Sequence, residues 1–185
     1  MESTPLLHVY AAREMIPEEK LRKGIELGMQ RTFEQDPKYA IRLLVDIAIR
    51  ALSPAVNDPT TAVQALDQIE DLLLRLGQRC LEIGRYRDSD GKLQLVVPFP
   101  TWDDLLLLAL DEICFCGATS VQVMRRMNAL VANLSRAVSK ERRTALEFWE
   151  ARLKASIARS FGDSEETLVA STQDRQGLGA PRHDS

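Results

Sequence analysis

The chain has 185 residues, of which 45% are hydrophobic, 5% aromatic and 28% charged. This length fits one domain, or one domain with tails, and the composition is typical of a soluble helical protein. The net charge of −3, from 24 basic and 27 acidic residues, lacks the basic surplus of nucleic-acid-binding domains, so we expect no nucleic-acid partner.

Histidine and cysteine restrict the chemistry that the chain supports. Its two histidines, His8 and His183, lie in the flanks, which disfavours a serine–histidine–acid triad or a histidine-rich metal centre. Its three cysteines, Cys80, Cys114 and Cys116, form an odd number in a chain without a signal peptide, which favours a reducing compartment or simple burial over a disulfide framework. We therefore predict no catalytic residue, no cofactor and no metal; whether the protein is an enzyme stays open, with a non-enzymatic role favoured.

No segment is apolar enough to cross a membrane. The longest candidate, Leu105–Leu110, is followed at once by Asp111 and Glu112, whereas a membrane-spanning helix requires about 18 to 20 apolar residues. We expect no direct membrane span in this chain, and a soluble protein if the chain is complete as given.

The chain begins with a short extended segment over residues 1–16, in which Pro5–Ala11 is rich in β-forming residues. Such a segment is too short to stand alone, so it either pairs with a later hairpin or is the remnant of an upstream β-rich domain. Pro17 and the two glutamates that follow it predict a first helix over about residues 17–35.

Aspartate–proline pairs start the next two helices. Asp36 caps a helix over about residues 37–52 that is apolar around most of its circumference. Asp58 caps a long helix over about residues 59–83, whose apolar residues recur at spacings of three and four and which Gly84 ends.

A small β-hairpin is predicted next, near residues 85–97. The segments Arg85–Arg87 and Leu93–Val97 flank an Asp-Gly turn, the residue pair that tolerates positive φ angles. Pro98 and Pro100 then close this β segment.

Two long helical segments complete the pattern. Thr101 caps a helix that runs toward Val138, in which we expect a kink or break near Gly117–Ser120. Ser139 caps the last helix, which Gly162 ends, and residues 163–185 read as a polar, largely disordered tail. The fold class is mostly α: a helical bundle of five or six helices over residues 17–162, with one small β-hairpin.

Polar residues gather where the second helix meets the third. Arg42, Asp46 and Arg50 follow one another at spacings of four, which fits a local ion-pair ladder or a site where an arginine reaches an anionic ligand. The Ser53–Thr61 loop is interpreted either as a helix cap or as a site for a small anion or divalent metal, because both would use the free amides of the helix start. The candidate ligand or structural residues are Arg50, Ser53, Asn57, Asp58, Thr60, Thr61 and Asp46.

Three motifs carry a family resemblance. They are Arg31–Pro37, Leu44–Ala48 and Ala51–Ala62, the last reading ALSPAVNDPTTA. They resemble the signature of an uncharacterised bacterial family of predicted membrane proteins that carry a domain of unknown function. The resemblance covers about Leu6 to Leu178, and Asp174-Arg175 fits a weaker motif near its end.

The resemblance implies association with a membrane and transfers no catalytic residue. Members of this family usually carry several transmembrane helices and a small β-rich segment before this region, so the chain resembles only their C-terminal soluble region. A truncated reading frame or a free-standing soluble relative would explain the difference.

We therefore expect a helical module of a membrane protein, on the cytoplasmic face, that serves assembly or regulation. Its partners would be a second copy of the chain or a membrane protein. The alternative is a ligand-binding or hydrolytic domain for a small anion or divalent metal, centred on Ser53–Thr61.

Overall fold

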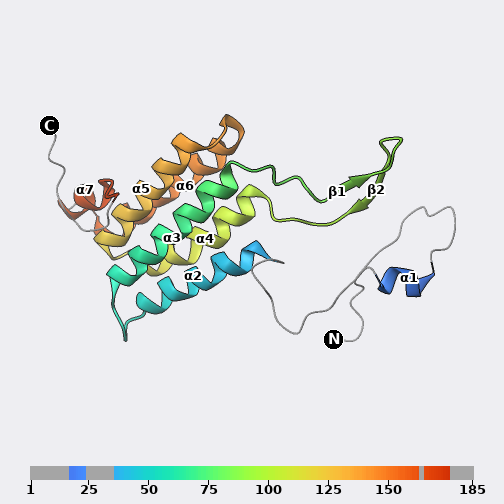
Figure 1. Ribbon diagram of the computed structural model, residues 1–185. Helices are drawn as coiled ribbons and strands as arrows, with labels where there is room; N and C mark the ends of the chain where they lie inside the picture. Colours follow the sequence, from blue (N-terminus) through green and yellow to red (C-terminus); the bar gives the residue numbers. More distant parts are fainter. Residues whose placement is uncertain (1–16, 24–35, 163–164, 176–185) are drawn as a thin grey trace. The chain divides into compact units, whose positions relative to one another are not determined.

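The computed structural model describes residues 17–23, 36–162 and 165–175 (Figure 1). The chain divides into two units, Met1–Thr32 and Phe33–Ser185. In the first unit, α1 (Glu18–Arg22) follows Pro17, and ion pairs one turn apart stabilise it, Glu18–Arg22 at 2.6 Å and Glu19–Lys23 at 2.9 Å. The rest of the helix predicted over residues 17–35, and the extended segment predicted before it, lie outside the described residues.

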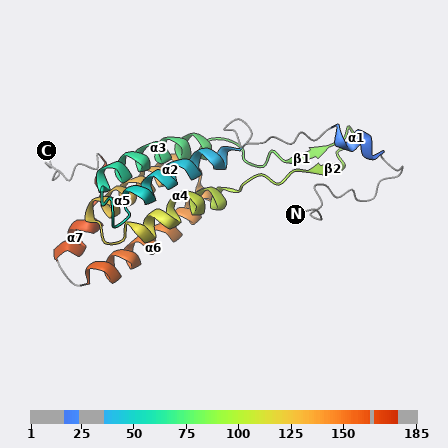
Figure 2. The same ribbon diagram turned by 90° about the horizontal axis from the view of Figure 1, so that it is seen from below.

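Five helices of the second unit pack as a bundle (Figures 1 and 2). They are α2 (Pro37–Ala51), α3 (Pro59–Gly77), α4 (Trp102–Cys116), α5 (Val121–Ala137) and α6 (Lys140–Phe161). Helix α3 packs against α2 and α5, α4 packs against α2 and α6, and α5 also contacts α6, so that the five helices enclose one core. The mostly α fold predicted from the sequence is confirmed. Within the described residues, no helix has the length and apolar character needed to cross a membrane.

The core is aliphatic, as the low aromatic content requires. Its largest fully buried side chains are Ile41, Leu66, Ile69, Leu73, Leu105, Leu106, Leu110, Ile113, Met124, Met127, Leu130 and Leu134. Within α3, α4 and α5 most of these residues recur at spacings of three and four, which places them on one face of each helix. Each contributes roughly 1.5–3 kcal/mol through its removal from water.

Helices α2, α3, α4 and α6 begin where the sequence predicts, although the Ser139 side chain makes no capping hydrogen bond at the start of α6. Asp36 accepts a hydrogen bond from the amide of Lys38 at 3.0 Å. Thr101 and Asp104 form a capping box at the start of α4, in which each side chain accepts from the other residue's amide. These contacts satisfy amides that the first turn of a helix otherwise leaves without partners.

The break expected near Gly117–Ser120 is confirmed between α4 and α5. A Cβ atom on Gly117 would lie 2.5 Å from a methyl group of Val123 and 2.9 Å from the carbonyl oxygen of Ile113, so only glycine fits there. Ser120 then caps α5 by accepting from the amide of Val123 at 3.4 Å. The break thus results from close packing at Gly117 and a new cap at Ser120.

Helix α3 ends at Gly77 rather than at Ile83, so the predicted end was wrong. The guanidinium of Arg142, on α6, donates to the backbone oxygens of Leu76 (3.3 Å), Gly77 and Arg79 (2.7 Å), the carbonyls at and just beyond the last turn of α3. Residues 78–83 are therefore not helical, and the apolar spacing that continues to Ile83 runs into a mostly exposed segment in which Leu81 is partly buried against the core.

A tryptophan and a glycine complete this junction. Trp102, at the start of α4, lies beneath the guanidinium of Arg142 at 5.5 Å and donates to its backbone oxygen at 3.2 Å. A Cβ atom on Gly77 would lie 2.8 Å from Val138 and 3.3 Å from the Trp102 ring. The end of α3 is thus determined by residues of α4 and α6 that are distant in sequence.

The predicted hairpin is present as β1 (Arg85–Arg87) and β2 (Leu93–Val96), paired antiparallel. Gly91 has a φ of +77°, as its turn requires. Gly84 does not end a helix as predicted: it is buried and lies so close to the Val97 carbonyl that a Cβ atom would overlap it. Both strands are exposed along their length, and both views show the hairpin apart from helices α2–α6 (Figures 1 and 2).

The disordered tail predicted from residue 163 differs from the structure at residues 165–175. Helix α7 (Glu165–Ser171) forms there and packs on α5 and α6, with Ala170 fully buried. Asn128 of α5 donates to the Ala170 carbonyl at 3.1 Å. The segment was missed because its own sequence is short and polar and its order derives from contacts with the bundle. The other residues of the predicted tail lie outside the described part of the chain.

Replacing Arg142 with alanine should lower the free energy of unfolding by roughly 1–3 kcal/mol, because three carbonyl groups lose their charged donor. Chemical denaturation followed by circular dichroism measures this loss. Lys140→Ala, an exposed change in the same helical turn, is the matched control and should stay within about 0.5 kcal/mol. Equal losses in the two variants would contradict this account of the α3 terminus.

Candidate functional site

The loop between α2 and α3 is held by its own backbone. The amides of Val56 and Asn57 donate to the Ser53 carbonyl at 3.0 and 2.8 Å, and the Asp58 amide donates to the Ala51 carbonyl at 2.8 Å. Asn57 has a φ of 47°, in the left-handed region that asparagine tolerates better than most residues. The loop therefore folds as a compact turn that fixes the start of α3.

Asp58 uses its carboxylate within the loop. Its Oδ1 accepts from the Thr61 amide at 3.1 Å and its Oδ2 from the Thr61 hydroxyl at 2.5 Å. The hydrogen bonds from the hydroxyl and then the amide of Thr61 hold the pKa of Asp58 below its usual range. An anion at this helix start would compete with a carboxylate for the same donors, so the geometry favours the capping interpretation. Thr60, beside it, is exposed.

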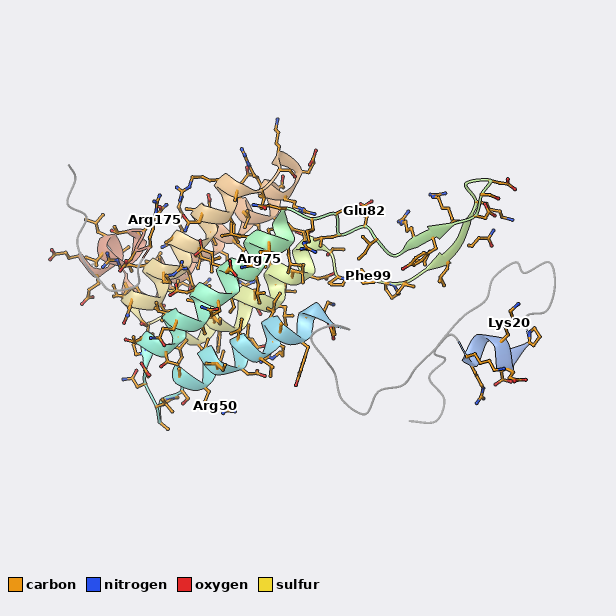
Figure 3. All side chains as sticks on the ribbon, in the orientation of Figure 1. Lys20, Arg50, Arg75, Glu82, Phe99 and Arg175 are labelled. Carbon is orange, nitrogen blue, oxygen red and sulfur yellow. The ribbon has the colours of Figure 1, made fainter. Side chains whose placement is uncertain are left out.

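Asp46 and Arg50 do not join this loop. Asp46 accepts from Arg42 Nε at 2.8 Å, and Arg42 also donates to Glu112 of α4, with Nη2 and Oε2 3.1 Å apart. The hydrogen bond to Glu112, and then the one to Asp46, raise the pKa of Arg42. The hydrogen bond from Arg42 in turn lowers the pKa of Glu112. Arg50 is exposed on α2 (Figure 3), with no ion pair to another described residue. Arg42 therefore connects α2 to α4, and Arg50 does not take part in the ion-pair ladder expected from the spacing of Arg42, Asp46 and Arg50.

The candidate residues thus give no geometric support to a metal site. In the part of the chain that the structure describes, no three histidine, cysteine, aspartate or glutamate side chains are grouped so that they could hold a metal ion. Of the three thiols, which are all free, Cys114 is buried, whereas Cys80 and Cys116 are exposed. Burial raises the pKa of the Cys114 thiol, which keeps it protonated and unreactive.

A buried polar cluster that the sequence analysis missed lies between α3 and α5. Arg126, with 3% of its surface exposed, donates Nε to Asp67 at 2.6 Å and Nη2 to Glu70. Asn133 donates to the other oxygen of Glu70 at 2.6 Å. The opposite charges let an arginine lie in an apolar bundle, since a buried charge needs a partner. The signal in the sequence that could have revealed this cluster is the position of Arg126 among the apolar residues that recur at spacings of three and four in α5.

Its neighbour Arg125 connects the bundle to the end of the chain. The Arg125 guanidinium lies 3.8 Å from the carboxylate of Asp174, and the Asp174 amide donates to the Arg125 carbonyl at 3.3 Å. Both side chains are buried. The weak motif noted at Asp174-Arg175 therefore contains a residue that holds the segment after α7 on α5.

A cleft of about 520 Å³ lies where the hairpin leaves the bundle. Its walls are largely apolar and include Leu81, Val97, Phe99 and Trp102. Arg142 borders the cleft, but carbonyl groups already engage its guanidinium. Glu82 and Phe99 are two of its lining residues at the bundle end of the hairpin (Figure 3). The cleft is thus a concave, mostly apolar surface at the base of the hairpin.

Comparison with known proteins matches residues 1–133 to the family described as "Predicted membrane protein (DUF2254)". Uncharacterised proteins of Mycobacterium tuberculosis and Mycobacterium bovis are each 31% identical to this chain over 148 residues, which is 80% of this chain and 28% of theirs. The chain therefore spans a little over a quarter of the length of these relatives. No solved structure matches the chain.

Asp58→Ala should lower the melting temperature at neutral pH by a few degrees, because the Thr61 amide and hydroxyl lose their acceptor. The folded-state pKa of Asp58 is depressed, so its contribution is present above the unfolded pKa and is lost as the pH falls through the folded one. The difference between wild type and variant should thus narrow below about pH 4. Thermal melts from pH 7 to pH 3 test this, with Thr60→Ala as control. A constant difference across this range would argue against the cap.

Arg126→Ala should cost about 3–5 kcal/mol of stability, because the buried carboxylate of Glu70 is left without its cationic partner. Arg75→Ala is a matched control: this arginine makes an exposed pair with Asp71, at 3.0 Å, so its loss should cost less than about 1 kcal/mol. Urea unfolding of both variants gives the comparison. Similar costs would show that the buried cluster is not a principal contact of the bundle.

Proposed function

This chain belongs to the DUF2254 family of predicted membrane proteins, and from this membership we propose that α2–α7 form a helical module, not an enzyme, that serves the assembly or regulation of a membrane protein. The observation that carries the proposal is the distribution of apolar surface. Of the fourteen large apolar side chains exposed among the described residues, seven lie between Ile83 and Phe99. Concentrated exposed apolar surface is typical of interaction sites.

The polar groups support the same function. Asp58 is engaged by Thr61, and Arg126 by Asp67 and Glu70, so that these charges stabilise the bundle and are not free for substrate. A rigid bundle with an apolar extension suits a module that positions or recognises another polypeptide. Its partner would be a membrane protein or a second copy of the chain.

We further propose that the module lies on the cytoplasmic side of the membrane. Cys80, Cys114 and Cys116 are all free, and two of them are exposed. Exposed free thiols persist in a reducing compartment, whereas an oxidising one promotes their pairing.

Fractionation of the native cells tests the proposal. The chain is expected in the membrane pellet, and a membrane-impermeant maleimide should label Cys80 of a Cys116→Ser variant in inverted vesicles but not in intact cells. The double variant Tyr86→Lys/Phe99→Lys should shift the chain to the supernatant because it removes exposed apolar surface from the hairpin and its base. Phe148→Lys, at a side chain of α6 that is more exposed than Tyr86 or Phe99, is the control. A wild-type chain found only in the supernatant would overturn the proposed function, and labelling in intact cells would overturn the cytoplasmic side.

A further inference from the structure

Helix α7 and the residues that follow it are held on the bundle by few side chains. Ala170 is the one buried side chain of α7, whereas its larger apolar residues, Leu168 and Val169, are exposed. A helix of seven residues is too short to be stable by itself in water. Residues 165–175, which we call the strap, therefore depend on their contacts with α5 and α6 (Figures 1 and 2).

The strap is joined to α5 by two hydrogen bonds and one loose ion pair. Asn128 donates to the Ala170 carbonyl at 3.1 Å, and the Asp174 amide donates to the Arg125 carbonyl at 3.3 Å. Arg125 Nη2 and Asp174 Oδ2 are 3.8 Å apart, and their side chains are 11% and 6% exposed. A charge-assisted hydrogen bond between such groups is usually about 2.7–2.9 Å long. The pair is therefore buried without close contact.

The burial of this pair makes the closed strap costly to maintain. Arg125 Nε is buried and has no hydrogen-bond partner in the part of the chain that the structure describes. Ions that lose their hydration regain the free energy only where their mutual geometry is good. Movement of the strap away from α5 would let water reach the guanidinium, which offsets part of the contacts that are lost.

The body of α5 is held far more strongly than the strap. Met124, Met127, Leu130 and Leu134 of α5 are fully buried among the bundle helices. Segments with few buried apolar contacts open locally at a lower free energy than the core, which opens only when the whole fold is lost. The strap and the bundle therefore differ in the free energy that each needs to open.

We propose that the strap is a reversible cover on α5, which opens while α2–α6 stay folded, and that the Arg125–Asp174 pair controls how often it opens. Opening releases the Arg125 guanidinium and the Asn128 amide, two groups of donors that the closed strap engages. The bundle thus has a closed and an open form that differ at one face of α5. This switch is independent of the assembly role proposed above and of the hairpin.

Hydrogen exchange followed by mass spectrometry tests the local opening in the unmodified 185-residue chain. The backbone amides over Val169–Asp174 should exchange more slowly than those of an unstructured peptide, but at least about a hundredfold faster than those over Met124–Leu134. Equal rates in the two segments would mean that the strap opens only when the bundle unfolds. Exchange of Val169–Asp174 at the rate of an unstructured peptide would mean that the strap is never closed. Either result would overturn the proposal.

Thiol labelling provides a second measurement of opening. The Cys80→Ser/Cys116→Ser background removes the two exposed thiols and keeps Cys114, which is buried in the bundle. Ala170→Cys adds a thiol beneath the strap, at a fully buried position. An aromatic disulfide reagent should label residue 170 at least about a hundredfold faster than Cys114, because only the strap has to open. Labelling of both thiols at one rate would contradict a separate opening.

Asp174→Asn tests the control by the ion pair. It leaves the buried charge of Arg125 without its carboxylate, so labelling of residue 170 should become at least about tenfold faster while that of Cys114 stays the same. Adding Arg125→Met removes the uncompensated charge and should slow the labelling again. Arg175→Ala, at the exposed neighbouring position, is the matched control and should leave both rates unchanged.

Three results would overturn the role of the pair. The first is equal acceleration by Asp174→Asn and Arg175→Ala, which would indicate a general effect of substitution in the strap. The second is equal acceleration at residue 170 and Cys114 by Asp174→Asn, which would mean that the whole bundle has been destabilised. The third is labelling in the Arg125→Met/Asp174→Asn variant that is as fast as in Asp174→Asn alone, which would show that the charge of Arg125 does not drive opening.

Discussion

The bundle depends on one buried guanidinium. Arg126 enters the interface between α3 and α5, where Asp67 and Glu70 hold it and Asn133 supports Glu70. A buried charge is tolerated only where its partners are correctly placed, so this contact restricts how α5 can slide or rotate along α3. The same orientation directs Met127 and Leu130 into the core and Arg125 toward Asp174, after α7. One ionic cluster thus sets the packing of two central helices and of the final ordered segment.

The structure separates internal polar contacts from external apolar surface. In the helices and the α2–α3 loop, charged groups mostly engage other parts of the protein, as Arg42 does with Asp46 and Glu112. In the hairpin, apolar side chains such as Tyr86 and Leu95 face solvent. An enzyme commonly keeps polar groups available in a cleft, whereas an assembly module keeps apolar surface available outside its fold. The proposed role in assembly would use the second kind of surface, which this chain exposes at the hairpin and its base.

Most of the local structure could be predicted from sequence because its causes are local. Asp36 and Thr101 accept from amides within the next three residues, and Gly91 supplies the positive φ of its own turn. The end of α3 could not be predicted, because the apolar spacing continues to Ile83 and the group that caps Gly77 is Arg142, on a helix 65 residues later. Helix α7 could not be predicted either, because contacts with α5 and α6 stabilise it.

At the candidate site, too, some features have local causes and others depend on distant contacts. The motif around Asn57 and Asp58 was recognisable because a cap and a left-handed turn are properties of adjacent residues. The sequence alone determined the mostly α class, the starts of the helices, the break at Gly117 and the hairpin turn, since propensity, capping and sterics act over a few residues. Only the tertiary structure decided that Arg42 turns to α4, that Arg126 is buried against α3 and that the hairpin stays exposed. Those outcomes depend on which groups meet across the fold. The spacing of a long charged residue in the sequence is the same whether its charge reaches water or a distant carboxylate, so the sequence does not show which of the two occurs.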